Sequence, residues 1–216
     1  IAPSLQIGDG FWFFAADGPE YLRLATAAAE HGFPGIFFLT DRTPSQLFVR
    51  LLAILVTAFG EVASLAILIN CAAYALTCAL LVRMRQNGVL LAAVAFSPAA
   101  MLFSLQLLKE TLFFFLIVLM IAIFRRWQEL WRCGGAPGSL LACAAAMLAV
   151  VYALAGIRWY FATIVWGCSA IFLVLVSWPV RRRGLALAAS TVLFVLLAQC
   201  VRLGSLDMPP QIARML

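Results

Sequence analysis

The feature that most constrains this chain is a run of 21 residues, 62–82, that contains no charged side chain. At a rise of 1.5 Å per residue, such a run forms an α-helix about 31 Å long, which matches the hydrocarbon core of a bilayer. Of the 216 residues, 65% are hydrophobic and 11% are charged, against about 25% charged in a typical soluble domain. Because so few polar side chains cannot cover a water-soluble particle, we predict an integral membrane protein.

Further apolar stretches predict an all-α, polytopic transmembrane bundle. The six expected spans are 62–82, 88–108 (interrupted at Ser97-Pro98), 111–124, 140–155, 159–178 and 185–201. The stretch 47–59 is also apolar, but its 13 residues are too few to span and include Arg50, so we expect a short helix on the membrane surface. The expected domains are an outer loop with short interfacial helices at 1–61, the bundle at 62–203, and a further outer segment that starts at 204–216.

The charges divide between the two sides of the membrane when these spans alternate. One side receives Arg83, Arg85, Arg125, Arg126, Arg132, Arg181, Arg182 and Arg183. The other receives eight of the nine acidic residues, namely Asp9, Asp17, Glu20, Glu30, Asp41, Glu61, Glu110 and Asp207. Since loops rich in arginine stay in the cytoplasm, the acidic side is expected to face outward. The net charge of +6 is therefore a topology signal and argues against nucleic-acid binding.

Several classes of protein and site are excluded by what the chain lacks. Its six cysteines lie mostly inside apolar runs without a Cys-X-X-Cys pair, so we interpret them as small packing residues. His31 is the only histidine, which excludes a bis-histidine haem site. No P-loop, GxSxG or HExxH pattern occurs, which argues against ATPases, α/β-hydrolases and zincins.

The outer loop has its own pattern. Asp17-Gly18-Pro19-Glu20 predicts a turn that opens a helix at 20–30, because Pro is favoured at helix starts. One face of that helix is apolar and is expected to lie across the membrane surface: Tyr21, Leu24, Ala25 and Ala28. The alternative is an amphipathic helix with no functional role, whose acids simply face water.

Three charged residues stand at the outer ends of predicted spans. Lys109 and Glu110 interrupt two apolar runs, and charges at membrane depth usually face a bundle interior or an aqueous cavity. Arg158 lies between two spans beside Trp159 and Tyr160, where its guanidinium could bind a lipid phosphate through two parallel hydrogen bonds. The alternatives are that the Lys-Glu pair only marks a turn between helices and that Arg158 only anchors the interface.

As a set, these residues resemble motifs of the GT-C membrane glycosyltransferases, which include the protein mannosyltransferases and the bacterial transferases that add aminoarabinose to lipid A. The run 17–25 resembles the family's first outer loop, with its acid four residues before a Tyr. Arg42-Thr43-Pro44 followed by 47–60 is similar to the family's Arg-Pro-Pro and a short apolar helix that ends in Phe-Gly. Ser97-Pro98 with 104–110 resembles an "SP … S … E" stretch that opens a span with an acid.

The resemblance extends over nearly the whole chain, in order. The segment 155–158 resembles the family's later arginine motif, although Trp159 stands where Pro is usual, and Gly18 stands where a second acid often follows the loop Asp. By the family's pattern, one span should precede Ile1 and several should follow Leu216. The resemblance implies an enzyme of the bacterial inner (plasma) membrane that moves a sugar from a polyprenyl-phosphate donor to a lipid, glycan or protein acceptor on the outer face.

The same resemblance implies roles for individual residues. Asp17 is the expected catalytic base for the acceptor hydroxyl, and Glu110 a second carboxylate that orients the acceptor. Asp17 and Glu110 could also hold a divalent cation, Mg²⁺ or Mn²⁺, but family members differ in metal use and this stays open. Arg158 and Lys109 would bind the donor phosphate. Tyr21 and Arg42 are also expected to contact substrate.

Two other classes of function stay open. A transporter or flippase of a lipid-linked substrate would use similar loops and buried charges, but such proteins usually contain an internal repeat, and 62–85 does not repeat in 159–183. A non-catalytic membrane scaffold is the third. A shared cavity in which Asp17 and Glu110 face each other would favour the enzyme over the scaffold.

Overall fold

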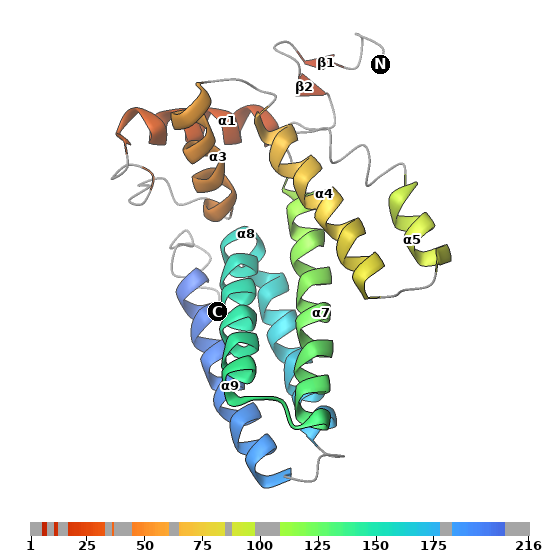
Figure 1. The fold of residues 1–216 in the computed structure, drawn as a ribbon. Helices are drawn as coiled ribbons and strands as arrows, with labels where there is room; N and C mark the ends of the chain where they lie inside the picture. Colours follow the sequence, from red (N-terminus) through yellow and green to blue (C-terminus); the bar gives the residue numbers. More distant parts are fainter. Residues whose placement is uncertain are drawn as a thin grey trace. The chain divides into compact units, whose positions relative to one another are not determined.

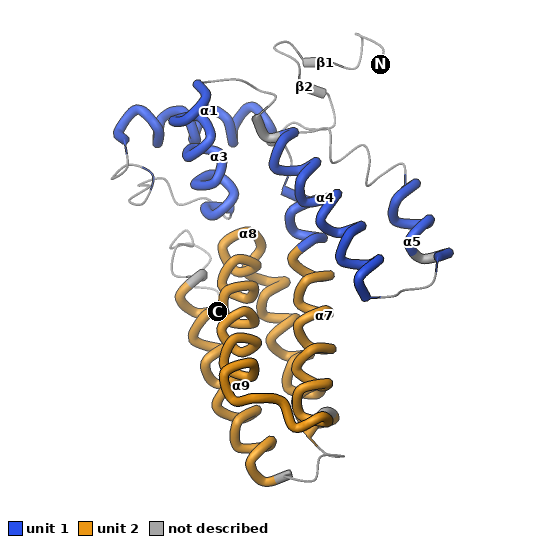
Figure 2. Tube along the Cα trace, viewed as in Figure 1, with its two compact units in different colours: residues 1–115 blue, residues 116–216 orange. Residues whose placement is uncertain are grey.

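The computed structural model describes residues 6–7, 11–12, 17–32, 36, 45–60, 65–84, 88–97, 109–177 and 183–205. The chain forms two compact units, Ile1–Phe115 and Leu116–Leu216 (Figure 2). The described regular elements are helices, apart from the two-residue strands β1 (Gln6–Ile7) and β2 (Phe11–Trp12), which pair antiparallel (Figure 1). The all-α prediction is thus confirmed for the described residues, with that one exception.

The described residues of the first unit form four helices and the start of a fifth. They are α1 (Asp17–Glu30), α3 (Gln46–Phe59), α4 (Leu65–Arg83), α5 (Gly88–Ala95) and the beginning of α7 (Glu110–Cys133). Helix α1 packs on α3, and α4 contacts both α3 and α5. The boundary after Phe115 separates two groups of residues that pack among themselves. The predicted boundary after residue 61 separates an outer loop from membrane spans, so it describes a different property of the chain.

Helix α1 begins earlier than the sequence predicted. Asp17 is its first residue and Pro19 its third. The first N–H groups of a helix have no carbonyl partner within it, so a proline in the first turn removes no hydrogen bond. The predicted turn at 17–20 is therefore wrong: these residues form the first turn of the helix.

The predicted apolar face of α1 exists, but protein covers it. Tyr21 and Leu24 are 8% and 4% exposed, and Ala25 is fully buried. They pack in one core with Phe48 and Leu52 of α3, both fully buried. The prediction that this face lies across the membrane surface is wrong, because the apolar face of α3 fills the position in which we expected lipid.

Helix α3 agrees with the short helix predicted at 47–59. Gly60 ends it at a φ of 84°, a left-handed conformation that glycine adopts without strain, and its N–H donates to the Val56 carbonyl at 2.8 Å. The face toward α1 is buried, whereas Ile54 and Phe59 are 44% and 64% exposed. Helix α3 is therefore apolar on both sides, and its position at the membrane surface stays a prediction.

The second unit contains the rest of α7, α8 (Pro137–Ser177) and α9 (Arg183–Ser205). Helix α8 is interrupted at Arg158, whose φ of −149° and ψ of 89° are not helical, and Figure 1 shows the chain reversing direction within α8. The interruption falls between the predicted spans 140–155 and 159–178. Helices α8 and α9 pack along each other, with the Trp166 and Phe194 rings stacked at 4.8 Å and the Ser177 and Ser190 hydroxyls 3.0 Å apart.

Helix α7 is longer than the predicted span 111–124 and continues to Cys133. Arg125 and Arg126 lie 3.7 and 3.2 Å from the Glu129 carboxylate, at i,i+4 and i,i+3 spacing. Such pairs favour helix. The apolar run 111–124 is short for a span, and we expected it to borrow a turn from each flank; the helix does extend beyond the run and continues through the arginines.

Two described helices are long and apolar enough to cross a membrane, Pro137–Leu175 and Gly184–Leu203. In the most apolar 18-residue stretch of each helix, only 33% and 22% of the residues are buried. The core helix of a soluble protein would be mostly buried. Large apolar side chains are exposed along both: Leu141, Ile171, Leu175, Leu185 and Val192. Of the predicted span 88–108, residues Gly88–Ala95 are helical and 98–108 lie outside the described residues.

Candidate functional site

Lys109 brings together three parts of the first unit that are far apart in the sequence. Its ammonium donates a hydrogen bond of 2.8 Å to the Tyr21 hydroxyl on α1 and another to the Ser45 hydroxyl at the start of α3. Lys109 itself directly precedes α7. Two of the predicted substrate-binding residues, Tyr21 and Lys109, are therefore in direct contact although 88 positions separate them.

The position of the Tyr21 hydroxyl is fixed by the core beneath it. The Tyr21 ring is 8% exposed and meets the Phe48 ring edge to face, with centroids 5.4 Å apart. The Lys109 ammonium lies 5.3 Å from the ring centroid. Because the ammonium bonds the hydroxyl, it lies beside the edge of the Tyr21 ring and not over its face. The interaction is therefore chiefly a hydrogen bond.

Ser45 is a member of the cluster that the sequence analysis missed. It occupies the N-cap position of α3 and is 1% exposed, yet its side chain makes no capping hydrogen bond. Instead, its hydroxyl accepts from Lys109. A Ser directly before an apolar helical run predicts a helix cap, and only the tertiary contact reveals the second use.

The described partners of Lys109 are both neutral hydroxyls. Within the described part of the chain, ion pairs join Arg23 with Glu20 and join Arg125 and Arg126 with Glu129, but none includes Lys109. A half-buried ammonium that no described carboxylate neutralises is suited to bind an anion. We call Tyr21, Ser45 and Lys109 the lysine cluster.

Glu20, by contrast, is fully occupied at the surface. Arg23 donates to its two carboxylate oxygens at 2.9 and 2.8 Å, and this hydrogen bonding holds the Glu20 pKa below its usual value. Both side chains are more than half exposed. Glu20 is therefore a solvated ion-pair partner and a poor candidate for a base.

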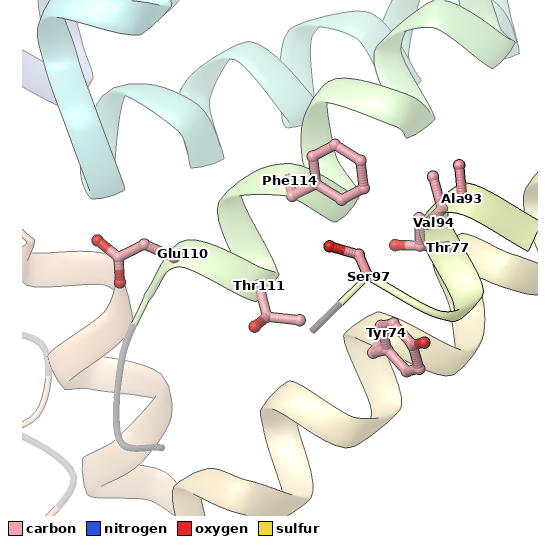
Figure 3. Close-up of a pocket in the computed structure, with 8 residues that line it drawn as sticks. All are labelled: Tyr74, Thr77, Ala93, Val94, Ser97, Glu110, Thr111 and Phe114. Atoms are coloured by element: carbon pink, nitrogen blue, oxygen red, sulfur yellow. The ribbon is translucent and has the colours of Figure 1, made fainter. Parts of the chain in front are cut away.

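Glu110 lines a pocket in the same unit. The pocket has a volume of about 320 Å³ and its walls are mostly apolar; the described residues that line it are Tyr74, Thr77, Ala93, Val94, Ser97, Glu110, Thr111 and Phe114. Figure 3 shows Glu110 at one end of the view and Ala93 and Val94 at the other. Glu110, a lining residue of the pocket, directly follows Lys109 of the lysine cluster in the sequence.

Two of the four described hydroxyls that line this pocket donate to backbone carbonyls. The Tyr74 hydroxyl donates to the Ala95 carbonyl, which ties α4 to α5, and the Thr77 hydroxyl donates to the Ala73 carbonyl. Thr111 differs: it is 6% exposed, and its hydroxyl has no hydrogen-bond partner among the described residues. Thr111 was not predicted as a site residue, because a Thr in the first turn of a helix is ordinary in sequence terms.

Arg158 lies in the second unit. Its Nη1 donates to the Tyr160 hydroxyl at 2.8 Å, and Tyr160 in turn meets Trp159 edge to face. The side chain is half-buried. Its position at the break in α8, with aromatic neighbours, fits either a phosphate ligand or an interfacial anchor.

The remaining predicted site residues lie partly or wholly outside what the structure describes. Asp17 opens α1, but its side chain is outside the described part, so the predicted facing of Asp17 and Glu110 lies there too. Arg42 also lies outside it. No group of three or more His, Cys, Asp or Glu side chains forms a metal site within the described ranges.

The chain matches no known family model, no curated protein and no solved structure.

Proposed function

We propose that the chain is part of a multi-pass membrane glycosyltransferase that moves a sugar from a polyprenyl-phosphate donor to an acceptor on the outer face of a bacterial inner membrane. The apolar helices α8 and α9 and the division of charges between alternate loops support a polytopic bundle. The GT-C-like motifs support the reaction. The break at Arg158 supports a further turn between spans.

The lysine cluster is the observation that carries this proposal. It joins the outer-loop helix α1 to the charged start of α7, the two regions in which the motifs place substrate binding. The leaving group of a polyprenyl-phosphate sugar is a phosphate, whose charge must be stabilised as the glycosidic bond breaks. A cation held by hydroxyls, with no described carboxylate to neutralise it, supplies that stabilisation.

In the proposed reaction, the acceptor hydroxyl attacks the anomeric carbon of the donor. The new carbon–oxygen bond forms as the bond from that carbon to the phosphate oxygen breaks, and polyprenyl phosphate departs with the electron pair. Asp17 takes the proton of the acceptor hydroxyl, and Lys109 stabilises the phosphate. Glu110 orients the acceptor; phosphate binding by Arg158 stays an expectation from the resemblance.

The experiment is a transfer assay on the full-length protein in proteoliposomes, with a polyprenyl-phosphate donor that carries a radiolabelled sugar. Lys109→Met should lower kcat/KM for the donor by roughly 10- to 100-fold, because a charged hydrogen bond is worth about 1.5–3 kcal/mol. Lys109→Arg, which keeps the charge, should retain most activity. Arg132→Met removes an exposed cation at the other end of α7 and serves as the matched control. Equal turnover by Lys109→Met and the unmodified protein would contradict the proposal.

A further inference from the structure

We propose that the pocket between α4, α5 and the start of α7 binds the acceptor, and that this acceptor is a hydroxyl-bearing lipid. The identification as acceptor rests on the proposed glycosyltransferase function, whereas the ligand chemistry follows from the pocket itself. Three features define that chemistry: the walls, the polar groups that stay available, and the surface onto which the walls extend.

The walls are suited to an alkyl or isoprenoid chain. Val94, Ala93 and Phe114 supply apolar surface, and the pocket's volume of about 320 Å³ lies at the lower end of the range for small-molecule sites, about 300–1,000 Å³. Such a pocket would accommodate part of a lipid chain. A free sugar would lose many hydrogen bonds to water here without replacing them.

The polar groups of the pocket fit a hydroxyl head. Tyr74 and Thr77 already donate to backbone carbonyls, so their hydroxyl protons are not available to a ligand. The Thr111 hydroxyl, 94% buried and unpartnered among the described residues, lines the same pocket. Leaving a buried hydroxyl unbonded costs free energy, and a ligand hydroxyl placed beside Thr111 would remove that cost. Figure 3 shows Thr111 between Glu110 and the apolar end of the pocket.

The walls also extend onto an apolar outer surface, which fits entry from a bilayer. Phe114 lines the pocket and is 41% exposed. Phe96, next to the lining residue Ser97, is 74% exposed, as is Val89 on α5. A lipid could therefore reach the pocket from the membrane, with its chain against the apolar walls and its hydroxyl near Thr111, the residue that directly follows Glu110.

A photocrosslinking experiment on the full-length protein in nanodiscs tests the ligand class without any sugar transfer. The probe is hexadecanol that carries a diazirine on its chain, and the competitors are hexadecanol and hexadecane. Hexadecanol should compete about fivefold better than hexadecane, with crosslinks in residues 88–97 and 109–115. Thr111→Val keeps the shape of the side chain and should abolish this preference. Ala93→Trp should fill the pocket and lower crosslinking about tenfold.

Two substitutions on α9 are matched controls. Thr191→Val removes an exposed hydroxyl and Ala188→Trp adds bulk at an exposed alanine, so neither should alter labelling. Equal competition by hexadecane in the unmodified protein, or unchanged labelling in Ala93→Trp, would overturn the proposed ligand class. If labelling behaves as expected but no sugar is transferred, the glycosyltransferase function fails while the hydroxyl-lipid site stands. If Ala93→Trp still transfers sugar to a lipid, the acceptor assignment fails while the glycosyltransferase function stands.

Discussion

The contact between Tyr21 and Lys109 yields a prediction whose size can be worked out from the structure. Tyr21→Phe removes one oxygen atom and keeps the ring, which is 8% exposed and packs against Phe48 at 5.4 Å. The core should therefore stay intact, and the loss is the 2.8 Å hydrogen bond from the ammonium. A hydrogen bond with a charged partner contributes about 1.5–3 kcal/mol. Because Lys109 is half-buried and keeps its bond to Ser45, we expect the lower end, about 1.5 kcal/mol.

A double-mutant cycle with Lys109→Met isolates this contribution. The free energy of unfolding would be measured for the two single variants, the double variant and the unmodified protein by denaturant titration in detergent micelles. We expect a coupling energy of about 1.5 kcal/mol between the two positions, well above the ~0.5 kcal/mol within which independent sites add.

The matched control is Tyr152→Phe in the second unit. Tyr152 is 42% exposed, and its hydroxyl makes no hydrogen bond within the described residues. Tyr152→Phe should therefore change the free energy of unfolding by no more than about 0.5 kcal/mol. If the Tyr21 and Lys109 substitutions prove additive, or if Tyr21→Phe costs no more than Tyr152→Phe, the lysine cluster would not hold α1 to the start of α7.

Two further predictions follow from the arginines. A reporter fused after Arg85, Arg132 or Arg183 should be cytoplasmic and one fused after Arg158 should be outside, because arginine-rich loops stay in the cytoplasm; an outside reporter at Arg132 would contradict the predicted alternation. Arg158→Lys keeps the charge but loses the planar guanidinium, so the affinity for polyprenyl phosphate, measured by titration in micelles, should fall at unchanged expression. Unchanged affinity would leave Arg158 as an interfacial anchor.

The parts of the fold that hydrophobic patterning controls were predictable from the sequence. The short helix at 47–59, the apolar face of α1 and the break between 155 and 159 all follow from where apolar runs begin, end and repeat. These features are local, because each depends on residues within a few turns of one another. From the resemblance to a family, Tyr21 and Lys109 were both expected to bind substrate. Their direct contact was not predicted.

The parts that depend on contacts between distant segments were not predictable. The apolar face of α1 is identical in sequence terms whether lipid or α3 covers it, so the membrane-surface interpretation failed. Ser45 and Thr111 are common residues at helix starts, and only their burial and partners set them apart.

The most direct test of the central claim is sugar transfer by the full-length protein that carries Asp17→Asn. Asn is nearly isosteric with Asp but cannot take a proton, so the variant should insert and bind polyprenyl-phosphate sugar normally. Its rate of transfer, measured as radiolabelled sugar incorporated in proteoliposomes, should fall on the order of 10²-fold or more. Glu30→Gln, an exposed carboxylate at the other end of α1, is the control and should transfer normally. Near-normal transfer by Asp17→Asn would contradict the proposal that Asp17 is the base.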